Sequence, residues 1–285
     1  MNKHKKYFEG IYFKIQDKNN SMAFIPGISA DEAFIQYIDI NTSYYFKYDK
    51  STYIRKNNSI IIEDNVLSPQ GLNLNLKSEN LNIQGNVSFT KLTPLKHHIM
   101  GPFKYLPMPC MHGIISMRHN VNGNITVNDN QILFNNAIGY IEQDKGISFP
   151  TNYIWLHCNL FNNNKKNNRS IMLAIADIPF LKTSFKGVIC AIKHKGNEHI
   201  LATYKGVEIL NYTDKQIILK QGKLYLKVDM FENNGQELLA PNKGNMIRTI
   251  KENICCKGKI SFYINNIPIF EQVSDYISFE YVEEK

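Results

Sequence analysis

The residues best suited to acid–base chemistry lie close together near the middle of the chain. Glu142, Asp144 and His157 all fall within the stretch IGYIEQDKGISFPTNYIWLHCNLF, residues 138–161. A buried carboxyl group has a raised pKa and can then donate a proton, and an imidazole titrates near neutral pH. We therefore identify Glu142, Asp144 and His157 as candidate catalytic residues for general acid or base chemistry.

Period-two alternation decides which side chains of this stretch could share a face. If residues 153–161 form a strand, one face carries Tyr153, Trp155, His157, Asn159 and Phe161. The alternate positions, 154 to 160, are all apolar and are expected to face a core. The first face mixes aromatic and polar groups, which suits the lining of a ligand cavity.

A second extended segment could meet the first at the same cavity. Tyr140, Glu142 and Asp144 share one parity, so two carboxylates and the imidazole of His157 could converge on one pocket. The predicted ligand-binding residues are Tyr12, Tyr140, Tyr153, Trp155 and Asn159.

Each candidate also has a purely structural interpretation. His157 could be a core histidine that hydrogen-bonds a neighbour, and Trp155 could be a core anchor. Asp144 could belong to a turn that ends at Gly146. Glu142 lies between apolar residues, but it could pair with a lysine on an edge strand.

Strands rather than helices are expected to position these residues. Alternation of apolar and polar residues predicts half-buried strands at 43–48, 72–76, 81–89, 216–219, 223–229 and 259–264. Predicted hairpin turns lie at Asn122-Gly123, Lys195-Gly196-Asn197, Gln221-Gly222 and Asn234-Gly235. The best helical candidate is 244–253, GNMIRTIKEN. The pattern predicts an all-β fold with antiparallel strands and little helix, as a sandwich or a barrel.

A weak internal repeat suggests two related β units. Residues 11–28 and 154–179 each contain a strand with an aromatic second residue, an Asn- and Lys-rich turn, and a strand that begins with Ser and reaches a Pro. This alignment places Tyr12 opposite Trp155 and Lys14 opposite His157. We predict two tandem units, 1–135 and 136–285. The alternative is chance similarity between two hairpins of biased composition.

The composition is that of a folded, basic protein. The 285 residues are 43% hydrophobic, which is enough for a sizeable core, and the formal net charge is +8. The only arginines are Arg55, Arg118, Arg169 and Arg248. Specific contacts with phosphates and bases favour arginine over lysine, so we expect a solvated basic surface and no nucleic-acid partner.

Targeting and redox features indicate a cytoplasmic location. No apolar run of signal-peptide length follows the basic N-terminal segment, and no stretch approaches the ~20 apolar residues of a membrane span. Peripheral contact with a membrane stays open. The five cysteines are odd in number and lack CxxC spacing, so neither a disulfide framework nor a zinc site is expected.

Other common sites lack support in the sequence. His97, His98 and His112 lie within the Pro-rich segment 94–113 and His119 follows it, but these histidines show no HxH or HxxxH spacing, so no metal site is predicted. We expect that segment to form an irregular crossing or a lid. GxGxxG, GxxxxGK[ST] and GxSxG motifs are absent from the sequence, and no cofactor is predicted.

The stretch around Glu142 resembles the signature region of the tocopherol cyclase family. There, an acidic Tyr-x-Glu strand is followed by a Gly, a Phe-Pro or Leu-Pro pair, and an aromatic strand that ends in Gln-Cys-Asn. The matching residues here are Tyr140, Glu142, Gly146, Phe149, Pro150, Trp155, Cys158 and Asn159. Residues 8–14 (FEGIYFK), 23–29 (AFIPGIS) and 238–242 (LLAPN) are similar as well, and they extend the resemblance over almost the whole chain.

The resemblance implies two lipocalin-like β-barrel or sandwich units that hold a long apolar molecule. Relatives include a cyclase that protonates a prenyl double bond to close a chromanol ring, and more distant carotenoid hydratases. Such chemistry needs a buried acid and aromatic walls, and no redox cofactor. The chain departs from the plant-type pattern at Lys145, where the family has Trp, and at His157, where it has Gln; both changes make the cavity more ionic.

Three functions remain open at this point. In the first, an enzyme cyclises or hydrates an isoprenoid- or quinol-like substrate, with Glu142 or Asp144 as the proton donor and His157 as partner base or orienting donor. In the second, a non-catalytic lipocalin-like carrier holds a hydrophobic small molecule. In the third, side chains fill the cavity and the role is structural. No oligomeric state is predicted.

Overall fold

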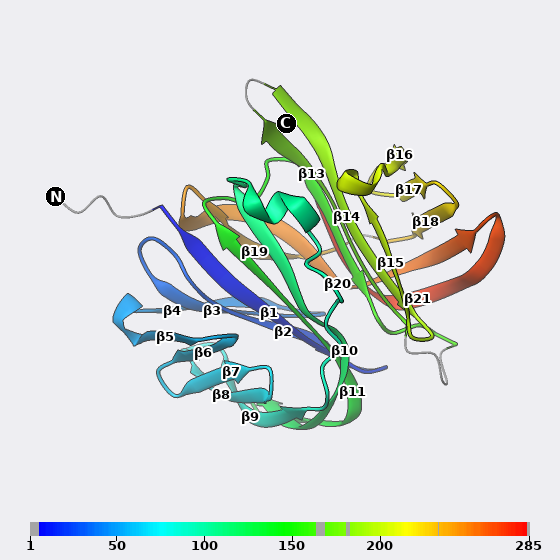
Figure 1. The fold of residues 1–285 in the computed structure, drawn as a ribbon. Coiled ribbons are helices and arrows are strands. Elements are labelled where there is room, and N and C mark those ends of the chain that lie inside the picture. Colours follow the sequence, from blue (N-terminus) through cyan, green and yellow to red (C-terminus); the bar gives the residue numbers. More distant parts are fainter. Residues whose placement is uncertain (1–5, 164–168, 181–182, 233, 284–285) are drawn as a thin grey trace. The chain divides into compact units, whose positions relative to one another are not determined.

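The chain folds almost entirely into β-strands. The computed structural model describes residues 6–163, 169–180, 183–232 and 234–283. It is 70% strand and 4% helix, arranged as two curled antiparallel sheets that each resemble half of a barrel (Figure 1). The predicted all-β, lipocalin-like architecture is therefore confirmed.

The first sheet contains eleven strands in the order β4-β3-β2-β1-β11-β10-β9-β8-β7-β6-β5. Their bounds are β1 Phe8–Gln16, β2 Ser21–Ile28, β3 Ala33–Asp39, β4 Ser43–Tyr48, β5 Tyr53–Lys56, β6 Ser59–Ile62, β7 Asn65–Ser68, β8 Gly71–Lys77, β9 Asn82–Phe89, β10 Cys110–Val127 and β11 Asn130–Gly146. The first strand, β1, thus pairs with the last, β11, and a meander extends on each side of this pair.

The second sheet repeats this arrangement in the order β15-β14-β13-β12-β21-β20-β18-β17-β16, and β19 pairs with β20. The bounds are β12 Tyr153–Cys158, β13 Ser170–Phe180, β14 Thr183–His194, β15 Asn197–Ala202, β16 Glu208–Tyr212, β17 Gln216–Gln221, β18 Leu224–Met230, β19 Gln236–Asn242, β20 Asn245–Ile264 and β21 Ile267–Val282. Three short 3-10 helices complete the described secondary structure: η1 Lys50–Thr52, η2 Gly101–Tyr105 and η3 Thr203–Lys205. Here too the first strand, β12, pairs with the last, β21.

Two compact units are formed, and each is discontinuous in sequence. Unit 1 contains Met1–Lys96, Pro109–Phe149 and Glu237–Thr249, and unit 2 contains His97–Met108, Pro150–Gln236 and Ile250–Lys285. These bounds differ from the predicted units 1–135 and 136–285, whose boundary falls inside strand β11. Each unit is described by itself below.

Each unit has its own hydrophobic core, built from alternate residues of its strands. In β8 the apolar residues Leu72, Leu74 and Leu76 are buried, and the residues between them are half-buried or exposed. The unit 1 core includes Ile11, Phe13 and Ile141, and the unit 2 core includes Ile154, Leu156 and Phe279. Residues of the opposite parity on β1, β11 and β12 are therefore directed away from these cores.

The predicted helix at 244–253 is wrong, because these residues belong mostly to strand β20. Met246, Ile250 and Ile254 are buried while Ile247 and Lys251 are exposed. The β-branched residues of the segment favour an extended backbone, and pairing within the sheet outweighs its weak helical pattern.

Two of the predicted hairpin turns hold and two are wrong. Turns at Lys195-Gly196 and Gln221-Gly222 join β14 to β15 and β17 to β18. Asn122-Gly123 instead forms an irregularity within β10, where Gly123 has φ +135° and a Cβ would lie 2.2 Å from the Asn86 carbonyl oxygen. Asn234-Gly235 precedes β19, which pairs with β20 rather than with β18. Local turn chemistry cannot distinguish a bulge from a hairpin.

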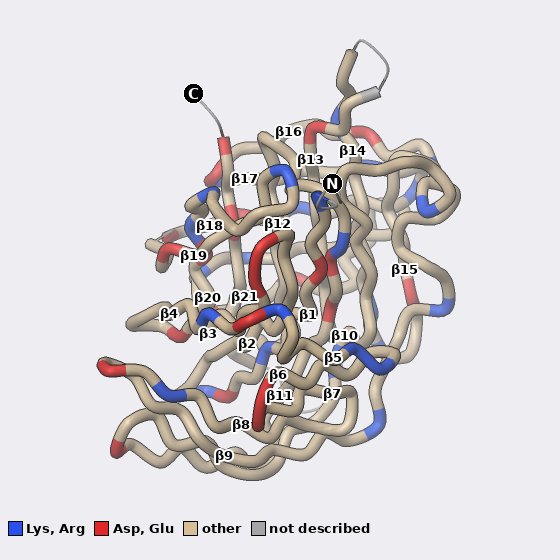
Figure 2. Tube along the Cα trace, turned by 90° about the vertical axis from the view of Figure 1, so that its left-hand side faces the viewer, with Lys and Arg blue, Asp and Glu red and all other residues tan. Residues whose placement is uncertain are grey.

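Charge is distributed along both units. In Figure 2, Lys and Arg positions are scattered over the trace and interleaved with Asp and Glu. Among the described residues, no helix is long and apolar enough to cross a membrane.

Candidate functional site

Strands β1 and β11 position the predicted site residues of unit 1. Tyr12 and Glu142 are directly paired across these two strands, so their side chains share one face of the sheet. Tyr140 and Asp144 lie two residues before and after Glu142 on the same face. Tyr12, Tyr140 and Glu142 are buried although this face points away from the unit 1 core. The predicted parity of these residues is correct.

A histidine from the neighbouring strand connects the two carboxylates. His112 of β10 is paired with Asp144 across the sheet. Its Nδ1 lies 2.9 Å from Asp144 Oδ1, and its Nε2 lies 3.4 Å from Glu142 Oε2. Tyr140 donates its hydroxyl hydrogen to the same oxygen of Glu142. These four side chains, which we call the His112 cluster, form a continuous polar network in which Glu142 is only 4% exposed.

The electrostatics of the cluster keep His112 protonated at neutral pH. Burial lowers the pKa of His112, but the carboxylates of Asp144 and Glu142, together with the hydrogen bond to Asp144, raise it to about 9. Burial and the Glu142 carboxylate raise the pKa of Tyr140, so the phenol stays a hydrogen-bond donor. The imidazole therefore holds a proton between two carboxylates at neutral pH.

The same three groups could also accept a divalent cation. Ligand atoms of His112, Glu142 and Asp144 all lie within 4.8 Å of one another. One imidazole nitrogen and two carboxylate oxygens suit several divalent metals. A proton on His112 also places a positive charge between the two carboxylates, so the same geometry suits a protonated histidine as well as a bound metal ion.

Unit 2 carries the second half of the predicted site on β12. Tyr153, Trp155 and His157 are buried, although they point away from the unit 2 core, and Asn159, which follows the end of β12, is buried as well. The rings of Trp155 and His157 are stacked with centroids 6.4 Å apart. The predicted lining row is thus a buried row of aromatic and polar groups.

A glutamate that sequence reasoning missed lies beside this row. Tyr153 donates a hydrogen bond of 2.6 Å to Glu280 of β21. Glu280 is directly paired with Trp155 on one side and with Glu252 of β20 on the other. The buried polar row of unit 2 therefore includes carboxyl groups, as that of unit 1 does.

One detail of the predicted strand is wrong at its end. Strand β12 stops at Cys158, and Phe161 belongs to the unit 2 core instead of the lining row. Leu160, which was expected in the core, is only partly buried. Alternation does not continue past the end of a strand.

The structure assembles part of the predicted site within each unit. Tyr12, Tyr140, Glu142 and Asp144 are brought together in unit 1, and Tyr153, Trp155 and His157 share one face of β12 in unit 2, with Asn159 just past the end of that strand. The predicted pairing of Glu142 with His157 joins residues of different units and stays a prediction. His112 is the residue of unit 1 that sequence reasoning missed as a partner of Glu142. The only local signal for it was a strand-like Cys-x-His pattern at the end of the Pro-rich segment.

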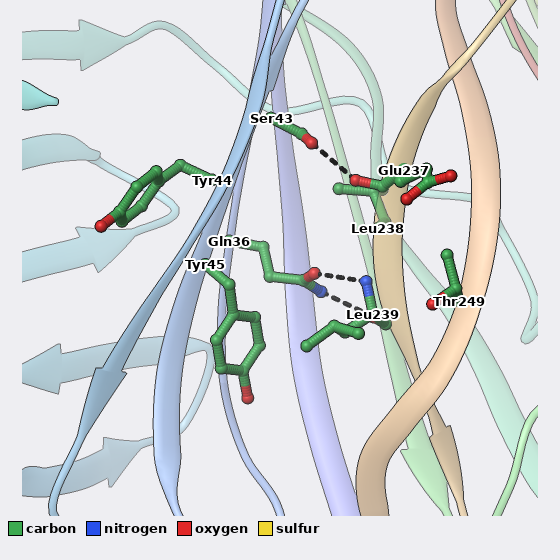
Figure 3. Close-up of a pocket in the computed structure, with 8 residues that line it drawn as sticks. All are labelled: Gln36, Ser43, Tyr44, Tyr45, Glu237, Leu238, Leu239 and Thr249. Carbon is green, nitrogen blue, oxygen red and sulfur yellow. Dashed lines mark hydrogen bonds between the residues drawn. The ribbon is translucent and has the colours of Figure 1, made fainter. Parts of the chain in front are cut away.

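A pocket of about 140 Å³ lies elsewhere in unit 1. As Figure 3 shows, it is bounded by Gln36 and Ser43 on one side and by the β19 segment on the other. The Gln36 amide bonds both the N–H and the carbonyl of Leu239, each at 2.8 Å, and Ser43 bonds the Glu237 carbonyl. The polar groups of this pocket mainly fasten β19, and it contains none of the predicted site residues.

Comparison with known families decides the assignment. The family described as tocopherol cyclase-like matches residues 77–275, which include the His112 cluster and the β12 row. The chain belongs to the tocopherol cyclase-like family. The similar stretches at 8–14 and 23–29 lie outside the matched range. No curated protein matches the chain.

Two solved structures share the fold of this tocopherol cyclase-like chain. A protein of Nitrosomonas europaea assigned as AttH has a TM-score of 0.56 and 11% identity, over 97% of this chain and 93% of that one. CghA has a TM-score of 0.60 and 8% identity, over 98% of this chain and 88% of that one. At this identity the likeness concerns the fold alone.

Proposed function

We propose that the chain binds a hydrophobic, isoprenoid- or quinol-like molecule and transfers a proton to a double bond in it. The observation that carries this proposal is the His112 cluster, in which a buried glutamate contacts a protonated imidazole and a phenol. A buried acid with a stored proton is what acid-assisted cyclisation or hydration requires. Membership of the tocopherol cyclase-like family supports the substrate class.

In the proposed mechanism the His112 imidazolium passes its proton to the Glu142 carboxylate, and Glu142 then donates it to the substrate. This proton forms a C–H bond at one carbon of the double bond, and the positive charge develops on the other carbon. A hydroxyl group of the substrate then forms the C–O bond in cyclisation, or a water molecule forms it in hydration. The proton released by that oxygen returns through the Glu142 carboxylate to the imidazole of His112, so the cluster is restored. Because its pKa is raised to about 9, His112 is protonated at neutral pH and holds the proton before each turnover.

The remaining predicted residues bind and orient the substrate in this proposal. Tyr12 and Tyr140 face Glu142 from β1 and β11, where aromatic rings stabilise a developing carbocation by cation–π attraction. Tyr153, Trp155 and Asn159 are proposed to line the apolar part of the ligand. The role proposed for His157 is that of an orienting donor, since His112 already contacts Glu142 within unit 1.

Ligand extraction followed by mass spectrometry identifies the substrate class, and Glu142→Gln then tests the mechanism. We expect this substitution to lower turnover by about 10²- to 10⁴-fold, the usual contribution of a general acid. Binding of the ligand should be retained, because the amide is similar in shape to the carboxyl group.

The matched control is Asp39→Asn in the same sheet. Asp39 accepts a hydrogen bond from Tyr37 two residues away, as Glu142 does from Tyr140, but has no histidine partner in the described contacts. We expect Asp39→Asn to retain turnover. If Glu142→Gln turns over like the parent, the catalytic assignment fails. If the parent binds the ligand without converting it, the carrier alternative replaces the enzyme.

A further inference from the structure

A buried arginine in unit 2 is not used by the proposed function. Arg169 lies directly before β13 and is 4% exposed. Its guanidinium carbon lies 4.1 Å from the centre of the Phe270 ring and 5.1 Å from that of Phe161. The two rings are themselves packed edge to face. The charge is thus surrounded by aromatic carbon near one end of the unit 2 core.

The only hydrogen bond of this guanidinium to described residues is made by Nε, which lies 3.2 Å from His194 Nδ1. Among the described residues, no carboxylate forms an ion pair with Arg169, and none accepts a hydrogen bond from its two Nη atoms. By contrast, Arg55 of unit 1 bonds Gln143 and lies near Glu9. Arg169 is therefore a buried cation without a counter-charge in the described structure.

The surroundings add positive rather than negative potential. Burial, Arg169, Lys195 and His199 lower the pKa of His194 to about 4, so His194 is neutral at pH 7. Because its Nδ1 accepts from Arg169, its proton resides on Nε2, where it is a second donor.

Aromatic rings do not satisfy this group completely. Stacking covers the face of a guanidinium, whereas its N–H donors project from the edge and require oxygen acceptors. A buried cation without an opposite charge costs several kcal/mol. His194 precedes the exposed Lys195-Gly196 turn, and Phe161 precedes the exposed Asn162, so the group lies just beneath the surface.

We propose that Arg169 and His194 form a binding site for an oxyanion, a carboxylate or phosphate group. The Nη1 and Nη2 donors match two oxygens of such a group in bidentate fashion. His194 Nε2 supplies a further neutral donor. This site lies within unit 2 and is independent of the proton-transfer proposal.

Thermal unfolding and titration calorimetry of the full chain test the site, with inorganic phosphate and acetate as probes. Ionic strength is held constant with sodium chloride, so that general screening is the same throughout. The wild-type protein should bind one anion saturably, and the melting temperature should rise with anion concentration as linkage requires. The stronger of the two probes identifies the source as phosphate or carboxylate.

Arg169→Met retains apolar packing on the rings and removes the bidentate Nη1 and Nη2 donors. We expect it to weaken anion binding by about tenfold or more. Arg169→Lys retains the positive charge but lacks the two parallel donors, and it replaces the Met variant in this test if that variant does not fold. The matched control is Arg55→Met, which should bind as the wild type does. The proposal is overturned if neither probe binds saturably to the wild type, or if both Arg169 variants bind the anion as strongly as the wild type does.

Discussion

The two units place a glutamate at the same position of the same strand arrangement and surround it differently. In unit 1, Glu142 of the last strand is paired with Tyr12 of the first, and in unit 2, Glu280 is paired with Trp155 in the same way. Tyr12 and Trp155 are the residues that the internal repeat aligns. Each glutamate also accepts a hydrogen bond from a tyrosine, Tyr140 or Tyr153.

The difference between the units comes from the third strand. On β10 of unit 1, His112 reaches both Glu142 and Asp144, whereas on β20 of unit 2 the residue paired with Glu280 is another carboxyl group, Glu252. Of the two buried histidines of unit 2, His157 stacks on Trp155, and His194 contacts an arginine. The pairing of first and last strands fixes where the carboxyl group lies, and the neighbouring strand fixes its chemistry.

The largest expected effect is that of His112→Leu. This substitution leaves the buried Glu142 and the half-buried Asp144 without the cation that contacts both, and breaking a buried ion pair costs about 3–5 kcal/mol. Denaturant unfolding at pH 7, followed by circular dichroism, measures the loss. His194→Leu is the matched control, because it removes a neutral histidine that makes one hydrogen bond, at about 1 kcal/mol. Equal losses would contradict the proposed difference between the units.

A smaller effect appears in the pH dependence of stability. The pKa of His112 is raised from 6.5 to about 9, so the folded state binds more protons than the unfolded state between these values. Its contribution is complete below pH 6.5 and is lost as pH rises through 9, on the order of 3 kcal/mol in total. The pKa of His194 is lowered to about 4, so its effect has the opposite sign: stability falls as pH falls from 6.5 toward 4.

Unfolding free energies measured from pH 4 to 10 separate the two histidines. We expect His112→Gln to remove the decline between pH 6.5 and 9, and His194→Gln to reduce the decline below 6.5. A His112→Gln protein that retains the alkaline decline would show that His112 is not the protonated group.

Period-two patterns in the sequence were sufficient to predict the fold class and the faces of the key strands. The alternation of Ile154, Leu156 and Cys158 predicted the core side of β12, and the parity of Tyr140, Glu142 and Asp144 was correct. Alternation works here because a side chain's face depends only on its position within its own strand.

Features that depend on long-range pairing could not be predicted in this way. The contact of His112 with Glu142 depends on the register between β10 and β11, and Glu280 reaches Tyr153 only because the last strand of unit 2 pairs with the first. A single sequence contains no local signal for such registers. The Asn122-Gly123 bulge was mistaken for a turn for the same reason, since only the partner strand distinguishes the two.

The smallest predicted effect concerns the two tyrosines that bond the glutamates. Tyr153→Phe removes a 2.6 Å hydrogen bond to Glu280, and a hydrogen bond to a charged group contributes about 1.5–3 kcal/mol. Tyr140→Phe removes the corresponding bond to Glu142, where His112 still contacts the carboxylate, so we expect the smaller loss there. The stability of unit 2 is measured by the fluorescence of Trp155, the only tryptophan, during unfolding. Hydrogen exchange measures the stability of both units. A larger loss for Tyr140→Phe would mean that His112 does not compensate for the missing phenol, which would contradict the coupling proposed for the cluster.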